Sequence, residues 1–157
     1  MPSPPQLRVA EPSDAPIISR LVNDAFRSER FFIDADRTDP DKVAALMQKG
    51  RFLMHIENDA LLGCIYTEIR GDRGYLGLLS VEPLHQRSGI GTALVAAAED
   101  FCRSAHCEFM DLTLVNVRRE LPPYYQRLGY KENGTLPFPP DQVPKVPVHL
   151  VRMSKRL

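Results

Sequence analysis

A glycine-containing turn, Gln86-Arg87-Ser88-Gly89-Ile90-Gly91, separates an apolar run from an alanine-rich run. The first turn of a helix carries unpaired backbone N–H groups and a partial positive charge, so it attracts anions. Glycines there let the phosphates of a ligand approach the backbone, and Arg87 adds a side-chain cation. The turn is therefore a candidate pyrophosphate site. The alternative is a strand-to-helix turn that needs glycine only for its backbone angles.

Two common nucleotide-binding motifs are excluded at this turn. The dinucleotide pattern G-x-G-x-x-G is incomplete, because Leu94 stands where the third glycine belongs. The G-K-[ST] of a phosphate-binding P-loop is also absent. Any anion site here must therefore belong to another class of fold.

Length and composition limit what the chain can be. Its 157 residues predict a disordered tail over 1–6 and a single domain over 7–157. Lys+Arg and Asp+Glu both number 20, which argues against a nucleic-acid partner bound through overall charge. No apolar run is long enough to cross a membrane. Three cysteines without a C-x-x-C pair, and scattered histidines, predict reduced thiols in a cytoplasmic protein and no metal site.

Hydrophobic periodicity predicts a mixed sheet with helices on its faces. The strand 75–81 is apolar on both faces, which favours a central position, and Gly77 within it marks a bulge or a close backbone approach. The predicted order is β-α-α-β-β-β-α-β-α-β-β. We expect strands at 7–11, three within 51–81, and others at 107–117, 130–135 and 148–157; helices at 12–28, 39–50, from 89, and within 118–130; and an extended proline-rich loop at 136–147.

Two blocks of the sequence match one known family. Gln86 to Gly91 follows the pattern [QR]-x-x-G-x-[GA] and comes after Val81-Glu82-Pro83, a V-x-P. A second block, YYQRLGYKENGT (124–135), follows the pattern Y-x-x-x-G-[FY]. Together they resemble the motifs of the GNAT superfamily of N-acetyltransferases, and the resemblance extends from Leu7 onward.

The resemblance implies an α/β GNAT fold, in which a central mixed sheet is flanked by about four helices and two parallel strands splay apart. It also implies that acetyl-CoA is bound between those strands, here 75–81 and 107–115. The backbone of Leu79, Ser80 and Val81 would pair with the pantetheine arm, and a bulge near Gly77 would help to part the strands. The pyrophosphate would be held by the backbone N–H groups of Arg87, Ser88, Gly89, Ile90, Gly91 and Thr92.

The chemistry implied is direct transfer of an acetyl group to an amine. Tyr125, four residues before Gly129, stands where the family often has the acid that protonates the leaving thiolate. Its neighbour Tyr124 is expected to face elsewhere and to pack. Glu68, acting through ordered water, is the preferred general base. Glu82, Asp111, Glu120, His149 and a water chain without a protein base are alternatives.

One family contact is in doubt. Relatives often carry an asparagine about seven residues before the tyrosine, and Arg118 occupies that position here.

The acceptor site is expected under the loops 26–40 and 136–147. Phe31, Phe32, Phe138 and the two prolines after it would form an apolar wall. Acidic residues that can attract a cationic amine are Glu29, Asp34 and Asp36.

We therefore predict a small-molecule amine N-acetyltransferase that uses acetyl-CoA and no metal. A protein acetyltransferase acting on lysines or N-termini is an alternative, although the proline-rich loop argues against an open peptide groove. A non-catalytic acyl-CoA-binding module is an alternative of another class. An exposed last strand can support a homodimer.

Overall fold

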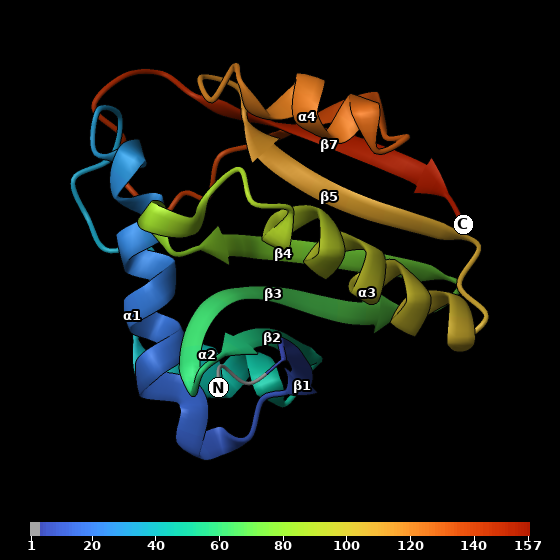
Figure 1. Ribbon diagram of the computed structural model, residues 1–157. Coiled ribbons are helices and arrows are strands. Elements are labelled where there is room, and N and C mark those ends of the chain that lie inside the picture. Colours follow the sequence, from blue (N-terminus) through green and yellow to red (C-terminus); the bar gives the residue numbers. More distant parts are fainter. Residues whose placement is uncertain (1–3) are drawn as a thin grey trace.

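The structure, a computed structural model, describes residues 4–157, whose strands form one seven-stranded sheet in the order β1-β2-β3-β4-β5-β7-β6 (Figure 1). The strands are β1 (Gln6–Val9), β2 (Arg51–Glu57), β3 (Ala60–Arg70), β4 (Arg73–Val81), β5 (Phe109–Val115), β6 (Lys131–Pro137) and β7 (His149–Arg156). The helices are α1 (Ala15–Ala25), α2 (Pro40–Met47), α3 (Ile90–Ser104) and α4 (Leu121–Arg127), with short 3-10 turns η1 (Pro12–Asp14), η2 (Phe26–Glu29) and η3 (Pro83–His85).

The predicted order of helices and strands is confirmed, and β4 lies at the centre of the sheet. The N-terminal boundary differs by one residue, because Gln6 already pairs with Ile56 in β1. The remainder of the predicted tail is partly outside the described residues, which begin at residue 4. The assignment of 7–157 to a single domain stays a prediction.

Alternating side chains divide the core between the two faces of the sheet. On β2, Phe52 and Met54 pack with α1 and α2 in one buried cluster, whereas Leu53 packs with α3 in the other. Successive residues of a strand point to opposite faces, so an apolar run such as 52–54 supplies both layers. Helices therefore cover both faces, with α3 in front of β3 and β4 in Figure 1.

The central strands part because β4 contains a bulge. Tyr66 of β3 pairs with Gly77, but Cys64 pairs with Ser80, so β4 carries one extra residue at this point. Leu78 adopts a left-handed φ of 53°, which a side chain rarely takes. Beyond the bulge, β4 has no further pairing with β5. The only parallel pairs in the described chain join 73–75 to 109–111, so the predicted splay between the two strands is confirmed.

An ion pair fastens the strands where they remain together. Arg73 of β4 donates two hydrogen bonds of 2.7 Å to the carboxylate of Asp111 on β5. Ser154 of β7 also donates to this carboxylate. Burial alone would raise the pKa of Asp111, but the bonds from Arg73 and Ser154 outweigh it and hold the pKa below its usual value. Three strands are thus linked at the closed end of the gap.

The predicted exposed last strand is wrong. β7 lies between β5 and β6 and pairs with both, so the sheet ends at β6 on this side. Hydrophobic alternation identifies a strand but carries no information on its neighbours, which is why the sequence did not reveal this order. The basis for a homodimer through the last strand is therefore removed.

Replacing Asp39 by alanine should destabilise the protein by about 1 kcal/mol, the usual value of an N-cap. The Asp39 carboxylate accepts a 2.8 Å hydrogen bond from the backbone N–H of Lys42 at the start of α2. Urea denaturation of Asp39→Ala measures the loss. Asp41→Ala removes the same charge from the same helix turn without removing a cap, so an equal loss in both variants would contradict the capping role.

Candidate active site

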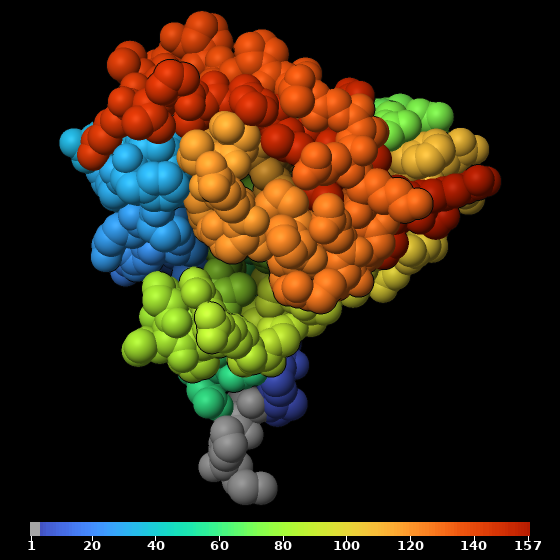
Figure 2. All heavy atoms as spheres, turned by 90° about the horizontal axis from the view of Figure 1, so that it is seen from above, coloured from blue at the N-terminus to red at the C-terminus, as the bar shows by residue number. Residues whose placement is uncertain are grey.

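A cavity of about 790 Å³ lies over the gap between β4 and β5. Its lining includes Leu79 and Val81 from β4 and Leu112 and Leu114 from β5. Seen from above in Figure 2, the turn before α3 (yellow-green), the segment after β5 (orange) and the loop after α1 (blue) surround its mouth. The bulge at Leu78 therefore opens a space that is continuous from the middle of the sheet to the first turn of α3.

The first turn of α3 presents free N–H groups to this cavity. The first hydrogen bond within the helix runs from Ala93 to Gly89, which leaves the N–H groups of Ile90, Gly91 and Thr92 without helical partners. Gly89 adopts a left-handed φ of 89°, and a Cβ placed on it would meet no atom within 4 Å. The side of the turn that faces the cavity is thus open, as an anion cradle requires.

Gly91 has a different reason to be glycine. A Cβ at Gly91 would lie 3.3 Å from the hydroxyl of Tyr124, which in turn forms a 3.0 Å hydrogen bond with the Thr92 Oγ1. Gly91 has no positive φ. It therefore lets α4 approach the start of α3. The expectation that Tyr124 faces elsewhere is wrong, because the short helix α4 places two successive tyrosines on the cavity.

Most residues predicted to contact the cosubstrate line the cavity, but two do not. Ser80 is buried, and its hydroxyl donates to the carbonyl of Leu78. The Ser88 hydroxyl donates to the carbonyl of His85. Neither serine is among the residues that line the cavity. The residues that do line the cavity are Leu79, Val81, Arg87, Gly89, Ile90, Gly91 and Thr92. Their roles in binding stay predictions.

Tyr125 is buried, with 5% of its surface exposed, and it lines the same cavity. Its ring packs edge-on against Tyr124 and Tyr130. Every buried side-chain nitrogen or oxygen in residues 4–157 has a hydrogen-bond partner. The Tyr125 hydroxyl has no hydrogen-bond partner within the described chain, so it is not one of these buried atoms. This hydroxyl must therefore be open to the cavity. Burial raises the pKa of Tyr125 above its ordinary value, so the group stays protonated at neutral pH.

Glu68 is not brought to the cavity. Its carboxylate accepts a 2.7 Å hydrogen bond from the hydroxyl of Tyr66 and is paired with Arg70. Burial would raise the pKa of Glu68, but these bonds outweigh it and the pKa is lowered, which makes the carboxylate a weaker proton acceptor. Its role as general base stays a prediction without support from position.

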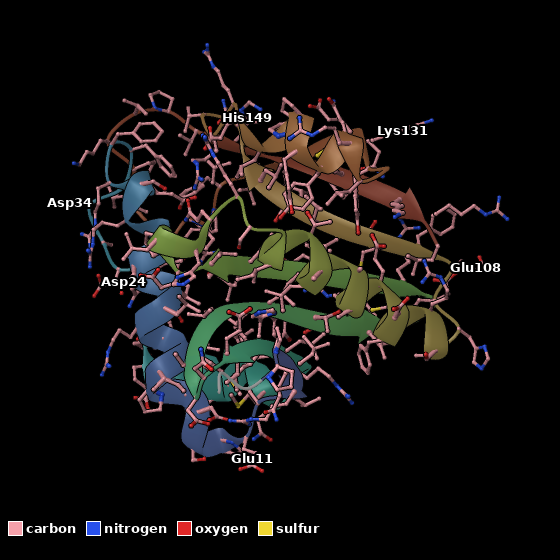
Figure 3. The ribbon with its side chains drawn as sticks, viewed as in Figure 1. Glu11, Asp24, Asp34, Glu108, Lys131 and His149 are labelled. Carbon is pink, nitrogen blue, oxygen red and sulfur yellow. The ribbon has the colours of Figure 1, made fainter. Side chains whose placement is uncertain are left out.

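The other candidate bases are also occupied or remote. Glu82 accepts a hydrogen bond from the backbone of Leu84, and Asp111 is held by Arg73. His149, at the start of β7 near the top of Figure 3, is absent from the cavity lining. Glu120 does line the cavity, but its carboxylate is bonded to Arg118.

An ion pair that the sequence did not reveal lies inside the cavity. Arg118 donates a 2.8 Å hydrogen bond to Glu29 Oε2, and both side chains are largely buried. Burial raises the pKa of Glu29, and the positive charges of Arg118 and Arg37 offset only part of this rise. The pair joins the end of η2 to the segment after β5. Arg118 thus holds a buried carboxylate at the position where relatives often have asparagine.

The predicted apolar wall forms in part. Phe32, Phe138 and Pro139 line the cavity, whereas Pro140 and Phe31, which is 57% exposed, lie outside it. The proline-rich segment is fixed by Lys145, whose backbone N–H and side-chain ammonium donate to the carbonyls of Phe32 and Arg30 at 2.6 and 2.9 Å. The two loops therefore form a joined roof.

The predicted acidic residues separate into two groups. Asp36 and Glu29 line the cavity, but Asp34 does not and lies at the outer edge of its loop in Figure 3. Among residues 4–157, no three or more His, Cys, Asp or Glu side chains are arranged to hold a metal ion. None of the helices described is long and apolar enough to cross a membrane.

Comparison with known sequences identifies relatives. The model of the acetyltransferase (GNAT) family matches residues 17–130. The uncharacterized protein YdhI of Bacillus subtilis (strain 168) is 30% identical over 81 residues, which make up 52% of this chain and 49% of that protein. The chain thus spans about half the length of this curated relative.

Several solved structures share the fold. A ribosomal-protein-alanine N-acetyltransferase from Brucella melitensis has a TM-score of 0.78 and 18% identity, covering 97% of this chain and 99% of that one. Nourseothricin acetyltransferase has a TM-score of 0.77 and 19% identity, with 98% and 99% covered. A putative acetyltransferase, yncA, from Salmonella typhimurium with its cofactor acetyl-CoA has a TM-score of 0.75 and 19% identity, with 99% and 95% covered. At these identities the likeness shows the fold.

The two glycines of the turn should respond differently to alanine. Gly89→Ala should cost about 1–2 kcal/mol of stability, because a left-handed φ is unfavourable for a side chain although space is available. Gly91→Ala meets no such strain, but it should displace Tyr124. Removing the Tyr124 hydroxyl in Gly91→Ala/Tyr124→Phe should therefore recover stability. Urea denaturation of the three variants checks this, and equal losses for both glycines without recovery would disprove the distinction.

Proposed function

The chain belongs to the acetyltransferase (GNAT) family, and on that premise we propose that it transfers an acetyl group from acetyl-CoA to a primary amine of a small molecule, by direct transfer in a ternary complex. The observation that carries the proposal is the gap between β4 and β5, which leads without interruption to the open first turn of α3. Family and fold support acetyl-CoA as the cosubstrate.

The chain's own groups fit an elongated acyl-CoA. The unpaired edge of β4 beyond the bulge offers backbone donors and acceptors to an extended amide-containing arm. Where that edge ends, the N–H groups of Ile90, Gly91 and Thr92 suit a pyrophosphate, with the Arg87 guanidinium beside them. Residues that would hold the cosubstrate are therefore Leu79, Ser80 and Val81 through their backbone, and the segment 87–92.

Tyr125 is suited to manage the proton of the leaving group. Bound acetyl-CoA supplies a thioester carbonyl carbon, which an amine attacks, and a thiol sulfur, which must gain a proton on departure. The Tyr125 hydroxyl is open to the cavity, lacks a competing hydrogen bond, and is kept protonated by burial. These are the properties of a general acid.

The shape of the roof favours a small acceptor over a protein. Lys145 ties the proline-rich segment to the loop after η2, and the Glu29–Arg118 pair closes the opposite wall. A polypeptide would have to displace these contacts. The similar structures include enzymes named for a ribosomal protein and for nourseothricin, so they do not decide between the two kinds of acceptor. The three free, buried cysteines fit a reducing compartment such as the cytoplasm.

Calorimetric titration of acetyl-CoA tests the proposed cradle. Wild type should bind. Gly89→Glu, which places a carboxylate at the phosphate site, should bind at least tenfold more weakly. Gly89→Ala introduces the same backbone strain without the charge, so it separates misfolding from repulsion and should stay within about threefold of wild type. No binding to wild type would refute acetyl transfer by this chain.

Tyr125→Phe should lower kcat by about a hundredfold, at the low end of the range for general acid catalysis, because a thiolate is already a good leaving group. The KM for acetyl-CoA should change little. Release of free thiol, measured with the best amine acceptor, gives both constants.

Tyr124→Phe is the matched control for this variant. It removes the hydrogen bond to Thr92 and should mainly raise the KM for acetyl-CoA. Unchanged kcat in Tyr125→Phe would leave the acid role without support, and it would direct attention to water as the proton donor.

A further inference from the structure

A second, smaller space adjoins the active-site cavity. It measures about 290 Å³ and lies beside α2. Arg37 and Leu78 line both spaces, so the smaller one, here called the α2 groove, borders the larger at these two residues. The lining of the α2 groove is completed by Thr38, Lys42, Ala45, Leu46 and Lys49.

The α2 groove is cationic. Its three charged lining residues are Arg37, Lys42 and Lys49, and no acidic residue lines it. Among residues 4–157, none of these three cations forms an ion pair within 4 Å; Arg37 lies over the ring of Phe26, and Lys49 acts at longer range on Glu68. The chain as a whole has a formal net charge of zero, so this concentration is local. The α2 groove should therefore favour binding of an anionic group.

A negative charge, the carboxylate of Glu29, lies in the main cavity, which Arg37 also lines. Glu29 is 7% exposed and lines the main cavity. Arg118 bonds to its Oε2, while Oε1 has no hydrogen-bond partner among the described residues. Because no buried side-chain oxygen in residues 4–157 lacks a partner, Oε1 must be accessible, and it can accept a hydrogen bond from an ammonium group. A cationic site and an anionic site therefore lie in two neighbouring spaces that share Arg37, which is close enough to act on Glu29.

We propose that the acceptor is a small amine that also carries a carboxylate, such as an amino acid, with its ammonium directed to Glu29 and its carboxylate in the α2 groove. This inference rests on the proposed function and names its substrate class. The amine must lose a proton before it attacks, and the burial that raises the pKa of Glu29 makes its carboxylate a better acceptor for that proton. The α2 groove then determines which amines are bound at all.

Matched pairs of probes test the carboxylate requirement. Alanine against alaninamide reports on an α-carboxylate, and glutamate against glutamine on a distal one. Each probe is titrated into the CoA-saturated protein by calorimetry and is also assayed for thiol release with acetyl-CoA. In at least one pair the acidic member should bind at least tenfold more tightly and show at least tenfold higher kcat/KM. Equal behaviour in both pairs would overturn the proposal.

Substitutions test whether the α2 groove is the source of the preference for the acidic probe. Arg37→Gln/Lys42→Gln should abolish the advantage of the acidic probe over its neutral partner. Arg20→Gln/Lys131→Gln removes the same charge from exposed positions that line neither space, so it should keep the preference. Raising the NaCl concentration should weaken binding of the acidic probe in wild type and in this control, but not in the groove variant. A preference that survives in Arg37→Gln/Lys42→Gln would place the carboxylate elsewhere and overturn the proposal.

Failure of this inference is distinguishable from failure of the proposed function. If acetyl-CoA does not bind, the proposed function fails, and the probe pairs are then titrated into the protein alone. If acetyl-CoA binds but the neutral probes equal the acidic ones, acetyl transfer stands and the carboxylate requirement falls.

Discussion

The bulge in β4 is the constraint on which the rest of the site depends. Three residue pairs hold β4 to β5, and the Arg73–Asp111 pair fixes them at one end. After Gly77 one extra residue turns β4 away, and a non-glycine residue, Leu78, adopts a left-handed backbone conformation there. Such strain persists only where the surrounding structure over-determines it. Here β3 on one side and the buried cluster of α1 and α2, against which Leu78 packs, supply that support.

The electrostatic environment differs from one part of the cavity to the next. At the start of α3, backbone N–H groups and Arg87 suit the phosphates of the cosubstrate. Near Tyr125, apolar and aromatic side chains exclude water and keep the hydroxyl protonated. At the acceptor end a buried carboxylate is stabilised by Arg118, since an unpaired buried charge would be costly. The same cavity thus offers different electrostatic environments within a short distance.

The parts of this structure that the sequence predicted are those set by local chemistry. The three strands within 51–81, the helix predicted at 39–50 and the glycine turn before α3 each depend on residues close together in the chain. What escaped prediction depends on distant partners. Glu29 and Arg118 are 89 positions apart, and neither residue signals the other. The position of β7 inside the sheet, and the tyrosine pair both facing the cavity, follow from packing that periodicity does not encode.

The gap between β4 and β5 also creates two unpaired strand edges in the middle of the molecule. Exposed edges are templates for pairing with another chain and so are sites of aggregation. Here the Tyr124–Thr92 hydrogen bond holds α4 across one end, and the loop fixed by Lys145 covers the other. The contacts that close the two ends of this gap therefore also keep the unpaired strand edges from pairing with other polypeptide chains.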